Sequence, residues 1–293
     1  MVRSLLSRYG KRPTHRWGQN FLVHRPTLER IVQAAAPGGA DLVIEIGPGL
    51  GTLTSALALQ AGRVLAMELD RDLENLLAET LAGLDNVEVR YQDALAVDWR
   101  QLLAVEFAAG PWREVKVVAN LPFYLTTPII TRLLEGELPL TRLVVMVQRE
   151  VAERFLALPG SKAYGAITVL VRYFTETTPV TRVPPTAFYP PPNVESTVLA
   201  MEVRSRPPVD TPWREMSPVI RGAFGQRRKT LANALAAAMG RTRSEIEAAL
   251  RLAGVDPRRR GETLSLGEFA AVTGALKTDC AGSPSHGPDG GPQ

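Results

Sequence analysis

Five apolar runs rich in Val, Ile and Leu alternate with segments of helical periodicity in the first half of the chain. The runs cover residues 42–46, 64–69, 87–91, 115–119 and 143–147. Because they are continuous rather than alternating, they predict strands that are covered on both faces. The pattern indicates an α/β domain with a mainly parallel sheet, and two later runs at 167–174 and 197–203 are candidates to complete it.

The last third of the chain has a different character. Residues 204–212 (RSRPPVDTP) hold three prolines and no periodicity, which is typical of a linker. Apolar residues then recur three and four positions apart and predict short helices at 213–224, 228–239, 243–253 and 266–276. We therefore expect an α/β domain at 1–203, a smaller all-helical domain at 213–277, and a disordered tail at 278–293.

Charge is unevenly distributed along a chain whose net charge is only +4. Residues 1–30 hold seven basic residues and one acidic residue, and 221–260 hold ten and three, whereas 31–220 hold sixteen and twenty-two. Phosphate backbones attract such basic segments by releasing condensed counterions, so the pattern favours a nucleic-acid partner. The alternative is that the arginines merely solvate a helix face.

Cysteine and hydropathy patterns exclude several classes of protein. The single cysteine, Cys280, lies in the expected tail, so neither an intramolecular disulfide nor a thiolate metal cluster is expected. No run approaches the roughly 20 apolar residues that a membrane-spanning helix needs. We expect a monomeric cytoplasmic protein with no metal site and no membrane contact.

A glycine-rich turn follows the first predicted strand. Residues 45–51 read EIGPGLG and lead into a helical pattern, so the turn can bring backbone close to a bound cofactor. Its G-x-G-x-G spacing differs from the dinucleotide G-x-G-x-x-G and counts against a nicotinamide or flavin enzyme. Glu68 ends the second strand and Asp93 follows the third, so all three features meet at one sheet edge. Either acid alone is more simply interpreted as an ordinary strand-end residue facing solvent, and the alternative for the glycine-rich segment is a turn with no ligand.

The sequence Asn120-Leu121-Pro122-Phe123 follows the fourth predicted strand at the same edge. The exocyclic amine of adenine is a poor nucleophile because its lone pair is delocalised into the ring. The side-chain oxygen of Asn120 and the carbonyl of Leu121 can accept from its two N–H groups, and Pro122 restricts the backbone that aims them. The ring of Phe123 offers a stacking face for an extruded base. A plain strand-terminating turn is the simpler alternative.

Taken together, these motifs resemble the ribosomal RNA adenine dimethyltransferases of the KsgA type. The resemblance spans most of the chain and also includes residues 18–22 (GQNFL), 188–196 (FYPPPNVES) and 224–231 (FGQRRKTL). It implies the Rossmann-like fold of class I methyltransferases, S-adenosylmethionine as cofactor and S-adenosylhomocysteine as product. It further implies dimethylation of two neighbouring adenosines near the 3′ end of small-subunit ribosomal RNA within a small-subunit particle.

The resemblance also implies roles for individual residues. Asn20 and Leu22 would close over the methionine end of the cofactor, and Gly47 and Gly49 would line its pocket. Glu68 would hold the ribose, Asp93 would meet the cofactor adenine, and Asn120 would lie between cofactor and substrate. Phe188 would face Phe123 across the target base, with core packing as its simpler role. The expected RNA-binding residues are Arg221, Arg227, Arg228 and Lys229.

Phe123 departs from the pattern, because these enzymes usually carry tyrosine there. Stacking survives the change, and the related antibiotic-resistance methylases of large-subunit RNA often carry phenylalanine. A large-subunit RNA methylase therefore stays open as an alternative, and so does a non-catalytic ribosome-assembly or RNA-binding factor. The family pattern does not explain the segment 108–112 (AAGPW).

Overall fold

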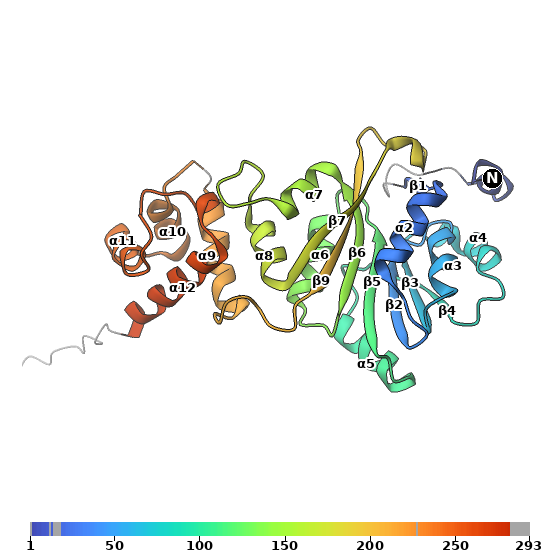
Figure 1. The fold of residues 1–293 in the computed structure, drawn as a ribbon, viewed down its shortest axis with the longest axis horizontal. Helices are drawn as coiled ribbons and strands as arrows, with labels where there is room; N and C mark the ends of the chain where they lie inside the picture. The colour runs from blue at the N-terminus through green and yellow to red at the C-terminus, as the bar shows by residue number, and fades with distance from the viewer. Residues whose placement is uncertain (1, 12, 14–18, 227, 282–293) are drawn as a thin grey trace, which may run out of the picture. The chain divides into compact units, whose positions relative to one another are not determined.

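The computed structural model describes residues 2–11, 13, 19–226 and 228–281. They divide into two compact units (Figure 1). One comprises Met1–Leu156 and Leu170–Ser205, and the other comprises Ala157–Val169 and Arg206–Gln293. The segment 157–169, which we expected in the first domain, thus groups with the C-terminal unit.

A seven-stranded sheet of order β4-β3-β2-β5-β6-β9-β7 forms the first unit. Five parallel strands, all predicted from the sequence, make up most of it: β2 (Asp41–Ile46), β3 (Arg63–Glu68), β4 (Val87–Tyr91), β5 (Glu114–Asn120) and β6 (Arg142–Gln148). Antiparallel β9 (Ser196–Val203) and β7 (Thr175–Val183) complete one edge. The mainly parallel α/β class is confirmed.

Helices pack against the sheet and explain the continuous apolar runs of its central strands, whereas β4 (VEVRY) alternates and is half-buried. The helices that lie before and between the strands are α1 (Val2–Arg8), α2 (Arg25–Ala35), α3 (Thr52–Ala58), α4 (Glu74–Thr80), α5 (Trp99–Ala109), α6 (Thr126–Glu135), α7 (Arg149–Leu156) and α8 (Ala166–Phe174). Ile31 of α2 and Leu53 of α3 pack with Val43 and Val118 of the central strands in one apolar cluster. Every residue of β2 is buried, which is why its sequence shows no polar alternation.

The prediction of a strand at 167–174 is wrong, because Ala166–Phe174 forms helix α8. A short apolar run has no periodicity that separates a buried strand from a buried helix. Here the backbone N–H of Gly165 donates to the Thr168 hydroxyl at 3.1 Å, a contact that favours a helical first turn. The real edge strand is the more polar β7, whose irregular pairing falls between Pro179 and Thr181.

A small two-stranded sheet joins distant parts of the sequence. In it, β1 (Phe21–Leu22) pairs antiparallel with β8 (Phe188–Tyr189), with Phe21 opposite Tyr189 and Leu22 opposite Phe188. The N-terminal segment is thereby held beside the segment that begins at Phe188.

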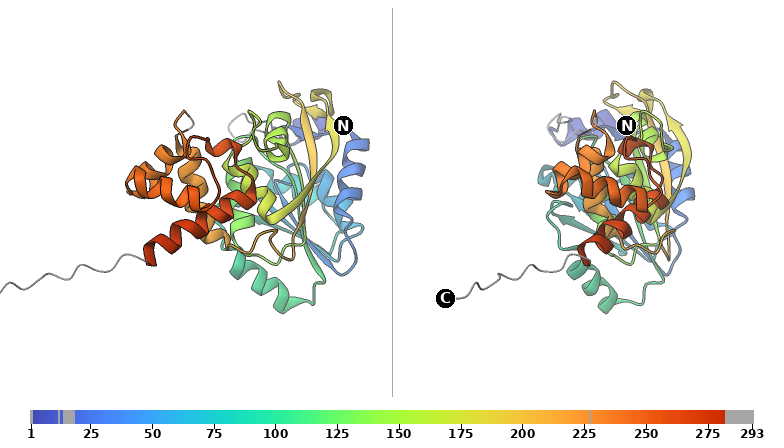
Figure 2. Two further views of the ribbon diagram at one scale, coloured as in Figure 1. Left: turned by 60° about the vertical axis from the view of Figure 1, so that its left-hand side comes forward. Right: turned by 90° about the vertical axis from the view of Figure 1, so that its left-hand side faces the viewer.

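The C-terminal unit contains helices and connecting turns in its described residues (Figure 2). Its main helices are α9 (Trp213–Gly225), α10 (Leu231–Met239), α11 (Arg243–Leu252) and α12 (Leu266–Ala281), which confirms the helical region. The half-buried Phe224 lies 6.0 Å from both of the buried rings of Tyr164 and Phe269, measured between ring centroids.

Two boundaries in the C-terminal unit differ from the sequence-based expectation. Helix α10 begins at Leu231 rather than at residue 228, because residues 228–230 form a turn. The disordered tail expected at 278–293 does not begin at residue 278, because residues 278–281 continue α12. The rest of the expected tail, residues 282–293, lies outside the described residues. In the described part of the chain, no helix is long and apolar enough to cross a membrane, and no cluster of metal-ligating side chains occurs.

Candidate active site

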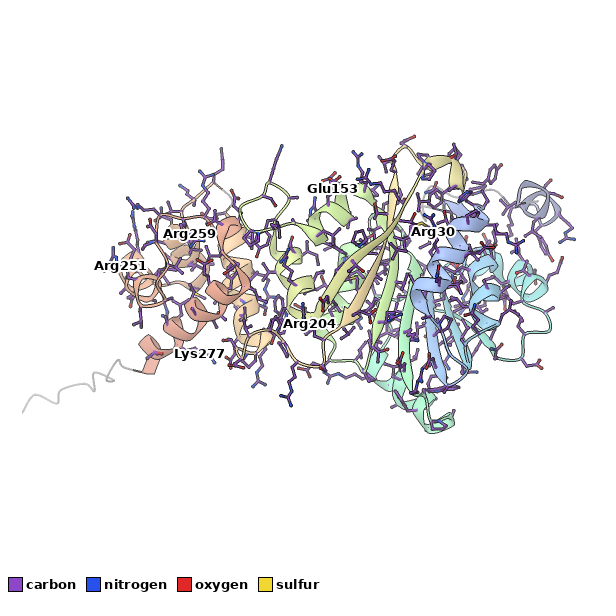
Figure 3. All side chains as sticks on the ribbon, in the orientation of Figure 1. Arg30, Glu153, Arg204, Arg251, Arg259 and Lys277 are labelled. Atoms are coloured by element: carbon purple, nitrogen blue, oxygen red, sulfur yellow. The ribbon has the colours of Figure 1, made fainter. Side chains whose placement is uncertain are left out.

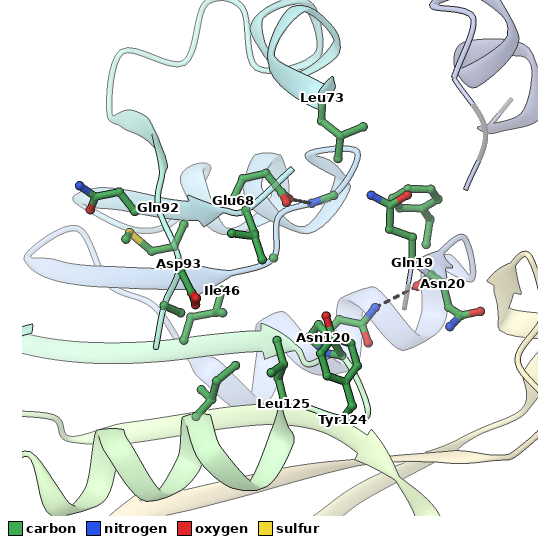
Figure 4. Close-up of a pocket in the computed structure, with 18 residues that line it drawn as sticks. Gln19, Asn20, Ile46, Glu68, Leu73, Gln92, Asp93, Asn120, Tyr124 and Leu125 are labelled. Carbon is green, nitrogen blue, oxygen red and sulfur yellow. Dashed lines mark hydrogen bonds between the residues drawn. The ribbon is translucent and has the colours of Figure 1, made fainter. Parts of the chain in front are cut away.

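A cavity of about 100 Å³ opens at the carboxyl edge of the parallel strands. Ligands of open α/β sheets bind at this edge. The structure brings together six of the residues singled out from the sequence, which line the cavity with others (Figure 4): Asn20, Gly47, Gly49, Glu68, Asp93 and Asn120.

The glycine-rich turn after β2 forms one wall of the cavity. Gly47 has a φ of +77° and Gly49 a φ of +56°, values that side-chain-bearing residues rarely adopt. A Cβ on Gly49 would lie 3.0 Å from the ring of Phe21, itself a lining residue. Both the backbone conformation and the close packing of Phe21 therefore require glycine at position 49.

Glu68 ends β3 and is 7% exposed. Its carboxylate accepts hydrogen bonds from the backbone N–H of Gly49 at 3.2 Å and of Asp70 at 2.8 Å. Burial raises the pKa of Glu68, while these backbone donors act to lower it. The contact with Gly49 ties the acid directly to the glycine-rich turn.

Asp93 follows β4 and is half-buried at the cavity wall. Its Oδ1 atom accepts from the backbone N–H of Leu95 at 2.8 Å, which fixes the orientation of the carboxylate. A carboxylate has about four acceptor positions, so capacity is left for a donor on a ligand.

Asn120 lies at the end of β5, where its side chain meets the N-terminal segment. Its Nδ2 donates to the backbone carbonyl of Asn20 at 3.1 Å (Figure 4). Because the nitrogen is committed to this carbonyl, the amide oxygen is left as an acceptor. The Leu121 carbonyl is a second acceptor: among the described residues no backbone N–H donates to it, whereas its own N–H donates to Met146.

The aromatic residues expected at the reactive site do not line this cavity. Phe123 is half-buried, and Phe188 is 5% exposed and packs in the apolar cluster beneath α2 and α3. Tyr124, which sequence reasoning passed over, does line the cavity and is 55% exposed. The only feature of the sequence that could have identified Tyr124 as a site residue is its position directly after the Asn120–Phe123 motif.

A smaller cavity of about 40 Å³ lies beside the first. Leu22, expected at the cofactor, lines this second cavity, as do Asn120 and Glu45. Burial raises the pKa of Glu45 from 4.5 to about 8, with a further contribution from the charge of Glu68. Its Oε2 atom has no hydrogen-bond partner among the described residues. An acidic residue inside a fully buried strand was the sequence signal that we did not use.

The expected RNA-binding residues belong to the C-terminal unit. Arg221 donates to the Ser217 hydroxyl at 3.3 Å, while Arg228 and Lys229 are exposed in the turn before α10. Neither of these two forms an ion pair with a described carboxylate. By contrast, Arg251 and Arg259 are paired with acidic residues (Figure 3). Arg227 lies outside the described residues.

Comparison with known proteins gives a consistent result. The family model described as ribosomal RNA adenine dimethylase matches residues 10–273. A protein of Moorella thermoacetica named ribosomal RNA small subunit methyltransferase A is 49% identical over 277 residues, covering 94% of this chain and 96% of that protein. A protein of the same name from Geobacillus thermodenitrificans is 48% identical and covers 94% of each chain.

Solved structures share the fold. A dimethyladenosine transferase from Plasmodium falciparum superimposes with a TM-score of 0.73 at 24% identity, covering 89% of this chain and 98% of that one. The 23S rRNA methyltransferase ErmE gives a TM-score of 0.65 at 26% identity, covering 88% and 100%. The expected Rossmann-like methyltransferase fold with a helical C-terminal region is confirmed. From the family match and these relatives together, the chain belongs to the ribosomal RNA adenine dimethylase family.

Proposed function

We propose that this protein transfers methyl groups from S-adenosylmethionine to N6 of two adjacent adenosines near the 3′ end of small-subunit ribosomal RNA. The product is N6,N6-dimethyladenosine. The observation that carries the proposal is the fixed Asn120 amide, whose nitrogen is held by Asn20 at a cavity that Glu68 and Asp93 also line. The relatives named for the small subunit support this substrate over large-subunit RNA.

The residues of the cavity fit the proposed cofactor. Its ribose hydroxyls and adenine amine are donors, and the buried Glu68 and half-buried Asp93 supply acceptors. Ile46 and Met67 add apolar surface for the adenine ring, while Gly47 leaves room for the cofactor beside the backbone. When bound, S-adenosylmethionine supplies an electrophilic methyl group on a sulfonium.

We propose that the chain promotes the reaction by positioning the N6 amine of the substrate. The Asn120 oxygen and the Leu121 carbonyl accept the two N6–H donors and draw the nitrogen toward tetrahedral geometry. Its lone pair then becomes available for an in-line approach, and the methylated nitrogen gives up one proton to solvent, with S-adenosylhomocysteine as the other product. The second transfer starts from a nitrogen with one N–H left, so only one of the two acceptors is then engaged. Pro122 holds the backbone between them, because its carbonyl accepts from the Leu125 N–H at 3.0 Å and the Thr126 hydroxyl at 3.2 Å. Orientation of this kind supplies much of the rate enhancement in enzymes.

The target adenosine must leave its base stack before its N6 atom can enter the active site. We propose that Phe123 offers a ring to the extruded base. Phe188 is also proposed to contact it, and for this role its buried ring must become accessible when RNA binds.

In the C-terminal unit, Arg221, Arg227, Arg228 and Lys229 are proposed to hold RNA phosphates. Such contacts strengthen binding without reading sequence. We expect a monomer that acts in the cytoplasm.

The proposal is tested by incubating purified small-subunit particles and separate large-subunit RNA with labelled cofactor and mapping the modified bases. We expect dimethylation of two adjacent adenosines near the 3′ end of the small-subunit RNA. The Asn120→Ala variant serves as the inactive control. Labelling confined to large-subunit RNA would show that this RNA, and not small-subunit RNA, is the substrate. Binding of particles without any methylation would indicate a non-catalytic factor.

A further inference from the structure

The aromatic ring that borders the cavity is Tyr124 rather than Phe123. Tyr124 is 55% exposed and lines the cavity with Asn120, while Phe123 is half-buried outside it. In Figure 4, Tyr124 lies near Asn120, whereas Asp93 and Glu68 occupy another part of the cavity. The ring therefore stands at the end where the substrate amine is expected, away from the acidic residues expected at the cofactor.

The backbone that carries Tyr124 is held in place on both sides. The carbonyl of Pro122 accepts two hydrogen bonds, from Leu125 and Thr126, and closes a turn around Tyr124. Immediately afterwards the Ile129 N–H donates to the Leu125 carbonyl at 3.0 Å and starts helix α6. A ring on a fixed turn loses little backbone entropy when it contacts a ligand.

Stacking of a base on the 55% exposed Tyr124 side chain would bury more of its surface. Base–aromatic stacking provides this burial and is independent of base identity, because every base has a π-face. We propose that Tyr124 stacks on the target adenine and holds it at Asn120, in addition to any contact from Phe123. This inference rests on the proposed function, since it assumes an extruded adenine as the ligand.

The test compares Tyr124→Ala and Tyr124→Phe with the wild-type protein, using small-subunit particles as substrate. Phe107→Ala is the matched control, because Phe107 is a 39% exposed aromatic residue on α5 that lines none of the cavities described here. We expect Tyr124→Ala to raise KM for particles about tenfold or more, the effect of losing one stacked base. Tyr124→Phe and Phe107→Ala should keep the wild-type KM.

A second measurement needs no turnover. Particles with 2-aminopurine at one target position are bound in the presence of S-adenosylhomocysteine. This base lacks the N6 amine, so it reports stacking independently of the Asn120 contact, and stacking on Tyr124 should quench its fluorescence. Tyr124→Ala should restore it, while Tyr124→Phe should not. Calorimetry with S-adenosylhomocysteine alone should give the wild-type affinity for all variants.

Three outcomes would overturn the inference. Equal KM and equal fluorescence for wild-type and Tyr124→Ala complexes would remove Tyr124 from the substrate site. A weaker affinity of Tyr124→Ala for S-adenosylhomocysteine alone would assign the ring to the cofactor. Loss of binding in Tyr124→Phe would assign the contact to the hydroxyl instead of the ring. Absence of any methylation by the wild-type protein would refute the proposed function, and the fluorescence comparison would still decide the role of Tyr124.

Discussion

The side-chain amide of Asn120 donates to the backbone carbonyl of Asn20 at 3.1 Å, across 100 positions of sequence. The bond fixes which end of the amide is the acceptor, and acceptor geometry is the basis of the proposed chemistry. It also ties the N-terminal segment to the end of β5, so this segment and the reactive motif face the same cavity.

Replacing Asn120 with Asp tests this orientation. The variant keeps the size of the side chain but places a carboxylate oxygen opposite the Asn20 carbonyl, and two acceptors cannot pair. We expect kcat to fall by about 10²-fold or more, a typical loss when a positioned reactive group is displaced. Asn20→Ala keeps the backbone carbonyl that accepts from Asn120, so it should lower kcat less than Asn120→Asp does, and loss of its own side chain at the cavity should appear in KM for the cofactor. A fully active Asn120→Asp enzyme would contradict the acceptor model.

Asp93→Ala should weaken cofactor binding. The loss of a directional hydrogen bond to the ligand costs about 1 kcal/mol or more, which calorimetry with S-adenosylhomocysteine resolves. Asp98→Ala is the control, because Asp98 accepts from the Gln101 N–H at 3.1 Å as the cap of α5 and does not line the main cavity. Equal affinities for the two variants would exclude Asp93 from the cofactor site.

Glu45 should make the stability of the protein depend on pH. Its pKa is about 8 in the fold and 4.5 as the ordinary value, so between these limits the folded state keeps a proton that the unfolded state releases. Stability from this group is therefore fully present below pH 4.5 and is lost as pH rises through about 8. Glutamine cannot ionise, so Glu45→Gln removes the free-energy cost of holding a buried carboxylate at high pH. The variant should therefore be more stable than the wild-type protein at pH 8.5 by about 1 kcal/mol or more.

Thermal unfolding of both proteins at pH 5 and pH 8.5 measures this effect. The informative quantity is the difference between variant and wild type at each pH, because groups that do not interact with Glu45 titrate equally in both; Glu68, whose charge contributes to the shift, is the exception. A difference that does not change with pH would show that Glu45 ionises normally in the fold.

The basic segment before α10 should set the salt dependence of RNA binding. Changing Arg227, Arg228 and Lys229 to Ala is expected to weaken binding to ribosomal particles and to flatten its salt slope by about one unit per lost phosphate contact. Arg243 and Arg251 are already paired with Glu247, so Ala at these two positions is the control. An unchanged affinity and slope in the triple variant would place RNA binding elsewhere.

Phe123→Tyr should remain an active dimethyltransferase, because the ring that stacks is retained. Product analysis by mass spectrometry should show N6,N6-dimethyladenosine for both proteins. Inactivity of this variant would mean that the site excludes a hydroxyl at position 123. Monomethyladenosine as the sole product of the wild-type protein would contradict the dimethyl assignment.

The sequence by itself determined the sheet class and the positions of the five parallel strands along the chain. Continuous apolar runs report that both faces of a strand are buried, and residues at the ends of parallel strands must gather at one edge. That is why Gly47, Glu68, Asp93 and Asn120 could be placed together before the structure was known. The edge strand β7 escaped prediction because its burial is partial and its pattern polar.

Tertiary structure alone decided which segments meet at the site and which side chains face the cavity. The pairing of Phe21 with Tyr189 and the bond from Asn120 to Asn20 join parts of the chain that carry no signal for each other. Likewise, adjacent aromatic residues look equivalent in sequence, yet packing exposes Tyr124 and partly covers Phe123. Local periodicity records whether a face is buried, whereas contacts between loops depend on how all the elements pack together.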